Sequence, residues 1–229
     1  RWPSLCAACG AFGSGRLCAT CLDRFARPRP RCGRCALPLE GAAGDAVCGA
    51  CLAHPPPFDA AVAAVDYRAP WDRLLADFKF HDAPELAGPL AERVLAALRR
   101  RPDLVVERVV PVPLAAGRLA ERGHNQAWEL ARRVARGLGI EAIASALVRV
   151  RDTPHQLDLP PVARAGNVRG AFAVEPARAA ALAGRRVLLV DDVMTTGSTA
   201  GELARVLRGA GAAFVAVAVV ARVPRPADA

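Results

Sequence analysis

The sequence predicts an α/β fold, an open and mainly parallel sheet with flanking helices, preceded by a small cysteine-rich module. Three observations lead to this fold class. All eight cysteines lie within residues 1–55. After residue 57, apolar runs typical of buried strands alternate with helix-period segments, as in a parallel sheet covered by helices. The apolar run Val187–Val190 ends in a polar turn that leads into a helix, which is where ligands of open α/β sheets bind.

The composition fits one full domain with a small appendage, since the chain has 229 residues. The longest apolar stretch, residues 212–221, is too short to span a bilayer, and the first residues hold no apolar signal segment. We therefore expect a soluble cytoplasmic protein without a membrane span. The formal charge of +9 favours an anionic partner such as a nucleotide, pyrophosphate or nucleic acid, although the arginines are spread along the whole chain.

Residues 1–55 are predicted to bind zinc. Their cysteines form four Cys-x-x-Cys pairs: Cys6 and Cys9, Cys18 and Cys21, Cys32 and Cys35, Cys48 and Cys51. Each pair places two thiolates on a tight knuckle, and two knuckles complete a tetrahedral four-cysteine site, so eight sulfurs suit two zinc ions. The spacing leaves open whether consecutive or alternating knuckles share an ion. A disulfide framework is the competing interpretation, and it requires an oxidising compartment.

Three consecutive prolines, residues 55–57, mark the predicted boundary between a module of residues 1–55 and a domain of residues 56–229. Hydrophobic periodicity then predicts strands at 58–67, 104–112, 143–150, 171–174 and 213–220, and helices at 71–78, 83–101 and 127–136. We interpret residues 151–170 as a long mobile loop that closes over a ligand. His155 within it is either an acid or base or a solvated polar residue.

Polar groups gather near the ends of these elements. Lys79, expected in the loop after the first helix, is the one lysine among 31 basic residues, so its compact ammonium is a candidate functional group. A proline-containing turn at residues 111–114 ends a strand, and a polar run at residues 118–126 precedes a helix. A helix start beside arginines suits a phosphate or pyrophosphate, although Asn125 and Gln126 would also serve as a plain helix cap.

The segment Val187–Thr199 combines a buried strand, two carboxylates and a hydroxyl-rich turn. Backbone N–H groups at the start of the following helix are unpaired, and the helix dipole favours an anion. Gly197 lets the backbone approach a ligand closely, so the turn fits a phosphate. Asp191 and Asp192 suit vicinal sugar hydroxyls or a magnesium ion. The segment therefore predicts a ribose 5-phosphate site, against the plainer interpretation of a buried strand with an Asp-rich turn.

At every position this segment resembles the phosphoribosyl pyrophosphate (PRPP) binding motif of type I phosphoribosyltransferases: four apolar residues, two acids, two apolar residues and a Thr-Thr-Gly-Ser-Thr loop. The resemblance implies the type I phosphoribosyltransferase fold for residues 56–229. It also implies displacement of pyrophosphate from C1 of PRPP, with Mg²⁺ holding the pyrophosphate. The residues that would bind PRPP are Asp191, Asp192, Val193, Thr195, Thr196, Gly197, Ser198 and Thr199.

Scattered motifs resemble the ComF family of competence-associated, phosphoribosyltransferase-like proteins, whose members also carry an N-terminal zinc ribbon. The motifs are Tyr67, Phe78-Lys79-Phe80, Pro111-Val112-Pro113-Leu114, Arg118, Arg122-Gly123-His124-Asn125-Gln126, Gln156, Arg164, Asn167 and Gly170-Ala171-Phe172. His124 departs from the family pattern, which more often has phenylalanine there. By this resemblance, catalysis involves Asp191, Asp192 and Lys79. The groups that would meet the pyrophosphate or its loops are Pro111, Val112, Pro113, Leu114, Arg118, Arg122, Asn125, Gln126, Arg164 and Asn167.

Three functions stay open at this point. The first is a PRPP-binding protein of DNA uptake, an enzyme or near-enzyme whose acceptor is unidentified. The second is a salvage phosphoribosyltransferase that acts on a free nucleobase, for which the sequence shows no recognisable specificity element. The third is a non-catalytic nucleotide sensor whose zinc module binds single-stranded DNA or a helicase-like partner, since one fold serves many functions.

Overall fold

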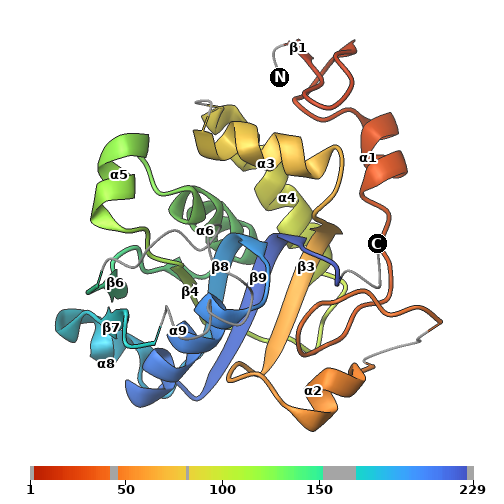
Figure 1. The fold of residues 1–229 in the computed structure, drawn as a ribbon. Helices are drawn as coiled ribbons and strands as arrows, with labels where there is room; N and C mark the ends of the chain where they lie inside the picture. The colour runs from red at the N-terminus through yellow and green to blue at the C-terminus, as the bar shows by residue number, and fades with distance from the viewer. Residues whose placement is uncertain (1–2, 42–45, 81–82, 152–168, 226–229) are drawn as a thin grey trace.

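A five-stranded parallel sheet runs through the computed structural model, which describes residues 3–41, 46–80, 83–151 and 169–225 (Figure 1). The strand order is β3-β9-β8-β4-β5, and every neighbouring pair is parallel. The strands are β3 Ala60–Asp66, β4 Arg108–Pro111, β5 Glu141–Ala142, β8 Arg186–Met194 and β9 Phe214–Arg222. The expected fold class, an open parallel sheet with flanking helices and a small N-terminal cysteine module, is confirmed.

Helices cover both faces of the sheet, because alternate strand residues point to opposite sides. Leu188 and Val190 of β8 belong to the same core as α3, α4 and α6, whereas Val187 and Leu189 pack with α9. All four side chains are fully buried, and each such burial contributes roughly 1.5–3 kcal/mol. The helices are α3 Trp71–Phe80, α4 Ala87–Leu98, α6 Gln126–Leu138 and α9 Ser198–Gly209.

The remaining elements are short. They are the antiparallel pair β1 Ser4–Leu5 and β2 Phe12–Gly13, α1 Ala19–Phe25, α2 Gly49–Ala53, η1 Pro84–Leu86, α5 Ala116–Arg122, the antiparallel pair β6 Leu147–Arg149 and β7 Phe172–Val174, η3 Pro176–Arg178 and α8 Ala179–Leu182. Within the described ranges, none of the helices has the length and apolar character needed to cross a membrane.

Some elements differ from the sequence-based expectation. α3 continues to Phe80, two residues beyond the expected end at Phe78, so Lys79 lies in the last turn of the helix and not in a loop. The helix expected at 83–101 begins as a 3₁₀ turn at Pro84 and ends as α4 at Leu98. Part of the polar run at 118–126 is helical, as α5, and this helix ends at Gly123 in the left-handed conformation.

The first half of the cysteine module, residues 3–27, packs against helices (Figure 1). The indole Nε1 of Trp71, at the start of α3, donates to the Phe25 carbonyl at 2.8 Å. Arg16 forms an ion pair with Glu85 of η1 at 2.9 Å. Side chains from this half also join the core on the α3–α4 side of the sheet. The first half is therefore attached to the domain through α3, η1 and the core beside them.

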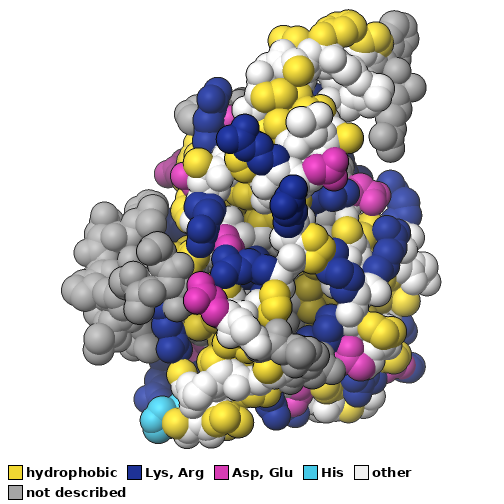
Figure 2. Space-filling view, turned by 90° about the vertical axis from the view of Figure 1, so that its right-hand side faces the viewer, with side chains coloured by type: hydrophobic (Ala, Val, Ile, Leu, Met, Phe, Trp, Pro, Cys, Tyr) yellow, Lys and Arg dark blue, Asp and Glu magenta, His cyan; other side chains and the backbone are white. Residues whose placement is uncertain are grey.

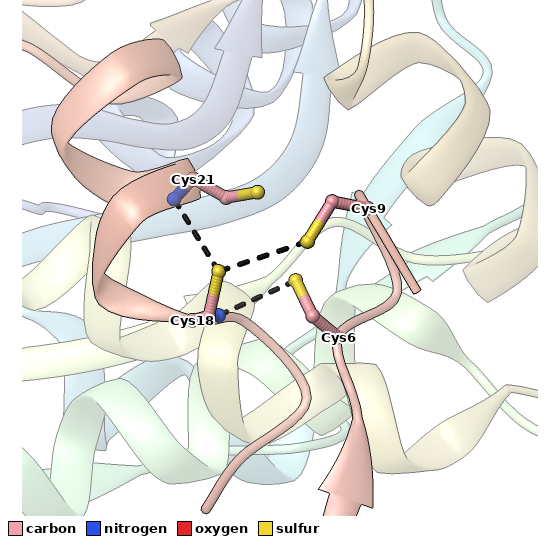
Figure 3. Close-up of side chains that lie close together, drawn as sticks. All are labelled: Cys6, Cys9, Cys18 and Cys21. Carbon is pink, nitrogen blue, oxygen red and sulfur yellow. Dashed lines mark hydrogen bonds between the residues drawn. The ribbon is translucent and has the colours of Figure 1, made fainter. Parts of the chain in front are cut away.

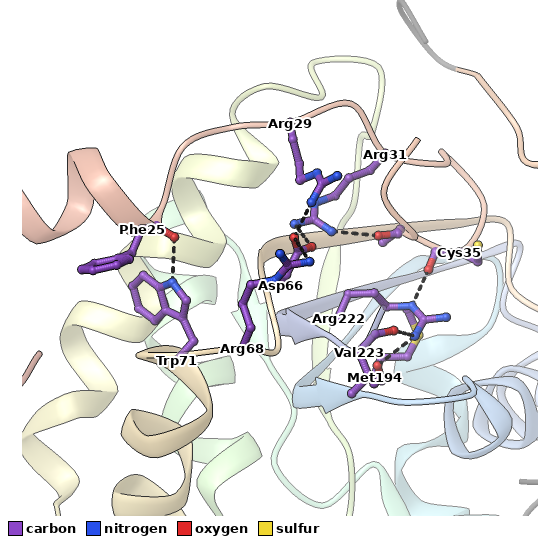
Figure 4. A network of polar contacts seen from close by, with 11 residues as sticks. Phe25, Arg29, Arg31, Cys35, Asp66, Arg68, Trp71, Met194, Arg222 and Val223 are labelled. Carbon is purple, nitrogen blue, oxygen red and sulfur yellow. Dashed lines mark hydrogen bonds and ion pairs between the residues drawn. The ribbon is translucent and has the colours of Figure 1, made fainter. Parts of the chain in front are cut away.

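The second half of the module, residues 28–41 and 46–55, includes contacts with β3, the edge strand of the sheet. The Ala61 N–H donates to the Gly33 carbonyl at 3.0 Å. At the carboxyl end of β3, the buried Asp66 carboxylate forms ion pairs with Arg29 at 2.7 Å and Arg31 at 2.8 Å (Figure 4). Backbone pairing and buried charge together hold this half against the sheet.

Candidate functional site

The eight cysteines form two clusters of four sulfurs. The first cluster holds Cys6, Cys9, Cys18 and Cys21 (Figure 3), and the second holds Cys32, Cys35, Cys48 and Cys51. Within each cluster the four Sγ atoms lie within 4.8 Å of one another, so consecutive knuckles share a site and the crossed arrangement is excluded. All eight residues are described, and all are free thiols and not disulfides.

Both clusters have the dimensions of a four-cysteine zinc site. Zn–S bonds of about 2.3 Å give sulfur–sulfur edges of about 3.8 Å in a tetrahedron. The Sγ atoms of Cys9 and Cys18 lie 3.8 Å apart, and those of Cys35 and Cys48 lie 3.7 Å apart. The Cys18 N–H donates to Cys6 Sγ at 3.4 Å, and the second cluster repeats this contact. The donor set therefore fits zinc.

The electrostatics of the sulfurs also favour a bound cation. Burial raises the pKa of Cys6, but backbone N–H groups lower it more, to about 6. Burial and the neighbouring sulfurs raise the pKa of Cys21 to about 12. In the second cluster, burial raises the pKa of Cys32, but backbone N–H groups lower it more, to about 7. Burial and the neighbouring Cys32 raise the pKa of Cys35 to about 11, although a backbone hydrogen bond from Leu37 opposes this. Full ionisation of either cluster thus needs a compensating cation, which Zn²⁺ would supply.

The β8–α9 loop, residues 195–197, has the strand–turn–helix context that a phosphate-binding motif needs. Gly197 has a φ of 85°, which side-chain-bearing residues rarely adopt, and it directly precedes α9. The hydroxyls of Thr196 and Ser198 lie 2.8 Å apart at the start of the helix. Backbone N–H groups in the first turn of a helix lack intrahelical partners, so this end of α9 suits an anion.

Lys79 is brought from α3 to the aspartates at the end of β8. Its Nζ lies 3.0 Å from Asp192 Oδ2, and the Asp192 side chain is 5% exposed. Burial raises the pKa of Asp191, the Asp192 carboxylate raises it further, and the result is about 8 although Lys79 opposes the change. Burial lowers the pKa of Lys79, but Asp192 and Asp191 raise it more, so the ammonium stays charged. Lys79 therefore forms an ion pair with Asp192 and also interacts with the Asp191 carboxyl.

The turn at residues 111–114 is held against both β8 and α6. The Val112 N–H donates to the Val190 carbonyl at 2.9 Å, next to Asp191. Asn125 caps α6, since its Oδ1 accepts from the Ala127 N–H at 2.9 Å. The same side chain donates through Nδ2 to the Val112 carbonyl at 3.2 Å. Asn125 is thus a helix cap that also fixes the turn, so the two sequence-based interpretations are compatible.

The other predicted site residues have varied positions. Gln126 is buried, and its Oε1 accepts no hydrogen bond from the residues that the structure describes. Arg118 is half-buried on α5. The side chain of Arg122 and the whole of His155, Gln156, Arg164 and Asn167 lie outside the described residues.

Arg222, which sequence reasoning misses, links the second cluster to the β8–α9 loop (Figure 4). It ends β9 and is only 5% exposed. Its Nε donates to the Cys35 carbonyl at 2.9 Å, and its Nη1 donates to the carbonyls of Met194 at 3.1 Å, Val223 at 2.7 Å and Thr195. No local pattern distinguishes this arginine from the many others in the chain, so only the fold reveals it.

A cavity of about 620 Å³ lies between the second cluster and the β8–α9 loop. Cys35 and Cys51 line one side, and residues 196–198 line another. Four arginines also contribute to its wall, namely Arg169, Arg205, Arg222 and Arg225. The second cysteine cluster and the loop therefore border the same cavity, whose wall includes several arginines.

Comparison with known proteins assigns both parts of the chain. The double zinc ribbon domain family matches residues 2–52, and the phosphoribosyl transferase domain family matches residues 125–229. The chain is 34% identical to the "DNA utilization protein YhgH" of Escherichia coli (strain K12) over 222 residues, which cover 94% of this chain and 95% of that protein. It is 34% identical to "Competence protein F" of Haemophilus influenzae (strain Rd) over 210 residues, 90% of each chain.

Solved structures align with part of the chain at low identity. The glutamine PRPP amidotransferase from B. subtilis complexed with ADP and GMP aligns with 62% of this chain at a TM-score of 0.41 and 19% identity. The matched part is 30% of that longer chain. The protein TT1426 from Thermus thermophilus aligns with 65% of this chain and 86% of its own, at a TM-score of 0.33 and 21% identity.

Proposed function

Because this chain belongs to the ComF family, we propose that it is a phosphoribosyltransferase-like protein that binds PRPP with Mg²⁺ and takes part in DNA uptake during natural competence. The observation that carries the proposal is the end of β8, where Asp191 and Asp192 precede a hydroxyl-rich loop at the start of α9. Carboxylates beside a helix N-terminus suit a molecule that has sugar hydroxyls next to a phosphate.

In the proposed complex the 5-phosphate lies against residues 195–199, where N–H groups of the first turn of α9 and the hydroxyls donate hydrogen bonds. Asp191 and Asp192 accept hydrogen bonds from the ribose hydroxyls. Val193, between the aspartates and the loop, packs against the core on the α3–α4 side and so keeps the strand in register. The backbone therefore presents the phosphate site and the sugar site at a fixed separation.

The pyrophosphate is proposed to meet the turn at residues 111–114, which borders the aspartates through the Val112–Val190 hydrogen bond. Mg²⁺ that arrives with PRPP would neutralise charge on the pyrophosphate. When ribose hydroxyls bind Asp192, Lys79 becomes available to the leaving group, and its compact ammonium stabilises the charge that develops there. The further groups proposed for this end of the ligand are Arg118, Arg122, Asn125, Gln126, Arg164 and Asn167.

We also propose one Zn²⁺ in each cysteine cluster and a division of the chain into a double zinc ribbon, residues 1–55, and a phosphoribosyltransferase-like domain, residues 56–229. The cluster dimensions and the family matches support the metal. Eight free thiols support a reducing compartment, and we propose the cytoplasm.

One observation favours a second candidate function, a non-catalytic nucleotide sensor whose zinc module binds single-stranded DNA or a helicase-like partner. Figure 2 shows many Lys and Arg side chains, with fewer Asp and Glu between them, on the face where the cysteine module and β3 lie. A cationic face attracts the phosphate backbone of nucleic acid. The cavity lined by Arg169, Arg205 and Arg225 adds to this positive surface.

Calorimetric titration of the full chain with PRPP and Mg²⁺ tests the ligand. We expect binding by the wild type and a loss of at least about tenfold in affinity for Asp191→Asn with Asp192→Asn, the loss that about 1.4 kcal/mol of hydrogen bonding corresponds to. Asp103→Asn, which changes a carboxylate paired with Arg101 before the amino end of β4, is the control. A wild type that does not bind PRPP would contradict the proposal.

Pyrophosphate release separates the candidate functions. An enzyme releases pyrophosphate from PRPP when its acceptor is present, and a salvage enzyme does so with a free nucleobase. A chain that binds PRPP but releases no pyrophosphate with any nucleobase or single-stranded DNA supports the sensor.

A further inference from the structure

We propose that metal binding at the second cluster (Cys32, Cys35, Cys48 and Cys51) orders the β8–α9 loop, and that Arg222 is the positioning residue which transmits the effect. The inference rests on the proposed function only for its consequence, that zinc in this cluster strengthens PRPP binding. The contact itself joins a predicted metal ligand to the loop in the ligand-free protein. Zinc in the second cluster would therefore affect the order of the proposed phosphate site without contacting the ligand.

The guanidinium of Arg222 touches backbone on both sides of the link. On one side it donates to the carbonyl of Cys35, whose Sγ belongs to the second cluster. On the other side it donates to the carbonyls of Met194 and Thr195, the last residue of β8 and the first of the loop. Because all these acceptors are backbone atoms, a shift of the Cys35 knuckle moves the donor that fixes the start of the loop.

Metal loss reaches Arg222 through the Cys35 knuckle. Arg222 is a buried cation that donates to the Cys35 carbonyl. Loss of the ion removes the bonds that hold this knuckle in place, so Arg222 loses a fixed acceptor. A buried charged donor without its acceptor keeps the cost of its desolvation, so the metal-free state favours withdrawal of Arg222 from the loop.

The segment that follows the second cluster, at Pro57 and Phe58, also packs against the β8–α9 loop and the start of α9. A Cβ at Gly197 would lie 3.8 Å from the Phe58 ring, and a Cβ at Gly201 would lie 3.2 Å from Pro57. Pro57 and Phe58 come a few residues after Cys51 in the chain. Displacement of the second cluster would therefore change their packing against the loop and against the first turn of α9. The second cluster therefore reaches the loop through two independent contacts.

The first cluster provides an internal control. Its surroundings are the helices: Trp71 bonds to Phe25, and Arg16 pairs with Glu85. None of the contacts found among the described residues joins Cys6, Cys9, Cys18 or Cys21 to the β8–α9 loop. Loss of metal from the first cluster should therefore leave the loop unchanged, whereas loss from the second should loosen it.

The experiment compares Cys48→Ser with Cys18→Ser in the full chain, since the two residues are equivalent in their clusters. Bound zinc, amide hydrogen exchange of residues 194–198 without ligand, and PRPP affinity are measured for each. We expect each variant to lose one zinc. Only Cys48→Ser should show faster exchange in the loop and an affinity about tenfold weaker, within the range of typical coupling between sites.

Arg222→Gln tests the link without touching a cysteine. We expect it to keep both zinc ions, to show the same faster exchange in residues 194–198, and to add little to Cys48→Ser in the double variant, because residues in one pathway are non-additive. Arg186→Gln is the matched control: Arg186 also donates to a backbone carbonyl, that of Val105 at 2.6 Å, but it lies at the amino end of β8, away from the second cluster and the loop.

Unchanged exchange in residues 194–198 in both Cys48→Ser and Arg222→Gln overturns the inference, and so does an equal effect of Cys18→Ser. If Cys48→Ser does not fold, the Arg222→Gln result decides alone, since that variant retains its metal. A wild type that fails to bind PRPP counts against the proposed function, while the exchange data still decide the inference.

Discussion

Replacing Lys79 with methionine should destabilise the protein and weaken PRPP binding together. The change keeps the length and apolar stem of the side chain but removes the cation that pairs with Asp192 and lowers the pKa of Asp191. Asp192 is then buried with its charge uncompensated, and the neighbouring Asp191 adds repulsion. Loss of one partner from a buried pair is costly because the remaining charge keeps its desolvation penalty.

The size of the effect follows from the geometry. Opposite charges 3.0 Å apart attract by about 5–6 kcal/mol at an effective dielectric constant of about 20. Desolvation of both groups offsets part of this, and breaking a buried pair costs about 3–5 kcal/mol in general. Lys79 keeps 24% exposure, so we expect about 3 kcal/mol. At about 2.1 cal/mol/K per residue, 229 residues have an unfolding entropy of about 0.5 kcal/mol/K, which gives a fall in Tm of about 6 °C.

Thermal melts from pH 5 to pH 8 measure this cost. The difference between the wild type and Lys79→Met should be largest near pH 8 and shrink toward pH 5, because loss of Lys79 raises the pKa of Asp191 further and this carboxyl takes up a proton as the pH falls. Arg73→Met on the same helix is the control: Arg73 is 79% exposed and lies 3.8 Å from Asp77, so its loss should cost under about 0.5 kcal/mol. Equal losses for the two variants would refute the reasoning.

Other contacts give four further expectations. Asp191→Asn should raise Tm at pH 8 and leave it unchanged near pH 4, since a carboxyl with a raised pKa in the folded state loses stability as the pH rises between these values; melts across pH test this. Asp66→Asn should cost about 3 kcal/mol in urea unfolding. Although burial raises the pKa of Asp66, Arg31 and Arg29 lower it more, so the wild type should lose this stabilisation in acid and the variant should not. Metal analysis should find about two zinc ions per chain, and chelation should open residues 3–41 to protease while β8 and β9 stay protected, because zinc supplies folding free energy to small modules. Gly197→Ala should cost about 1–2 kcal/mol, seen as a lower Tm, because φ is 85° there.

The sequence predicts best those features whose residues lie close together in the chain. The Cys-x-x-Cys knuckles and the run from Val187 to Thr199 each hold their partners within a few positions, so spacing alone predicts two sulfur clusters and a strand–turn–helix site. The parallel sheet follows from alternating strand and helix periods. The roles of single residues at that site stay predictions until ligand is measured.

Long-range contacts explain what the sequence does not reveal. Arg222 lies 187 positions from Cys35 in the chain, and its burial depends on both β9 and the second cluster being in place. Lys79 is helical because α3 continues two residues beyond the end that periodicity predicts. The pairing of knuckles depends on how residues between Cys21 and Cys32 run along the domain, which spacing does not encode.

β3 lies at the margin of the sheet, yet every residue from Ala60 to Asp66 is buried. An uncovered, apolar margin of this kind pairs readily with other chains and so promotes aggregation. Here the Gly33 carbonyl takes the Ala61 N–H, and the arginines around Asp66 close the far end. The cysteine module therefore covers part of this margin of the sheet. A fragment that begins after Pro57 would expose β3 as an apolar edge strand. The sheet domain produced alone should therefore self-associate unless charged residues are introduced along β3.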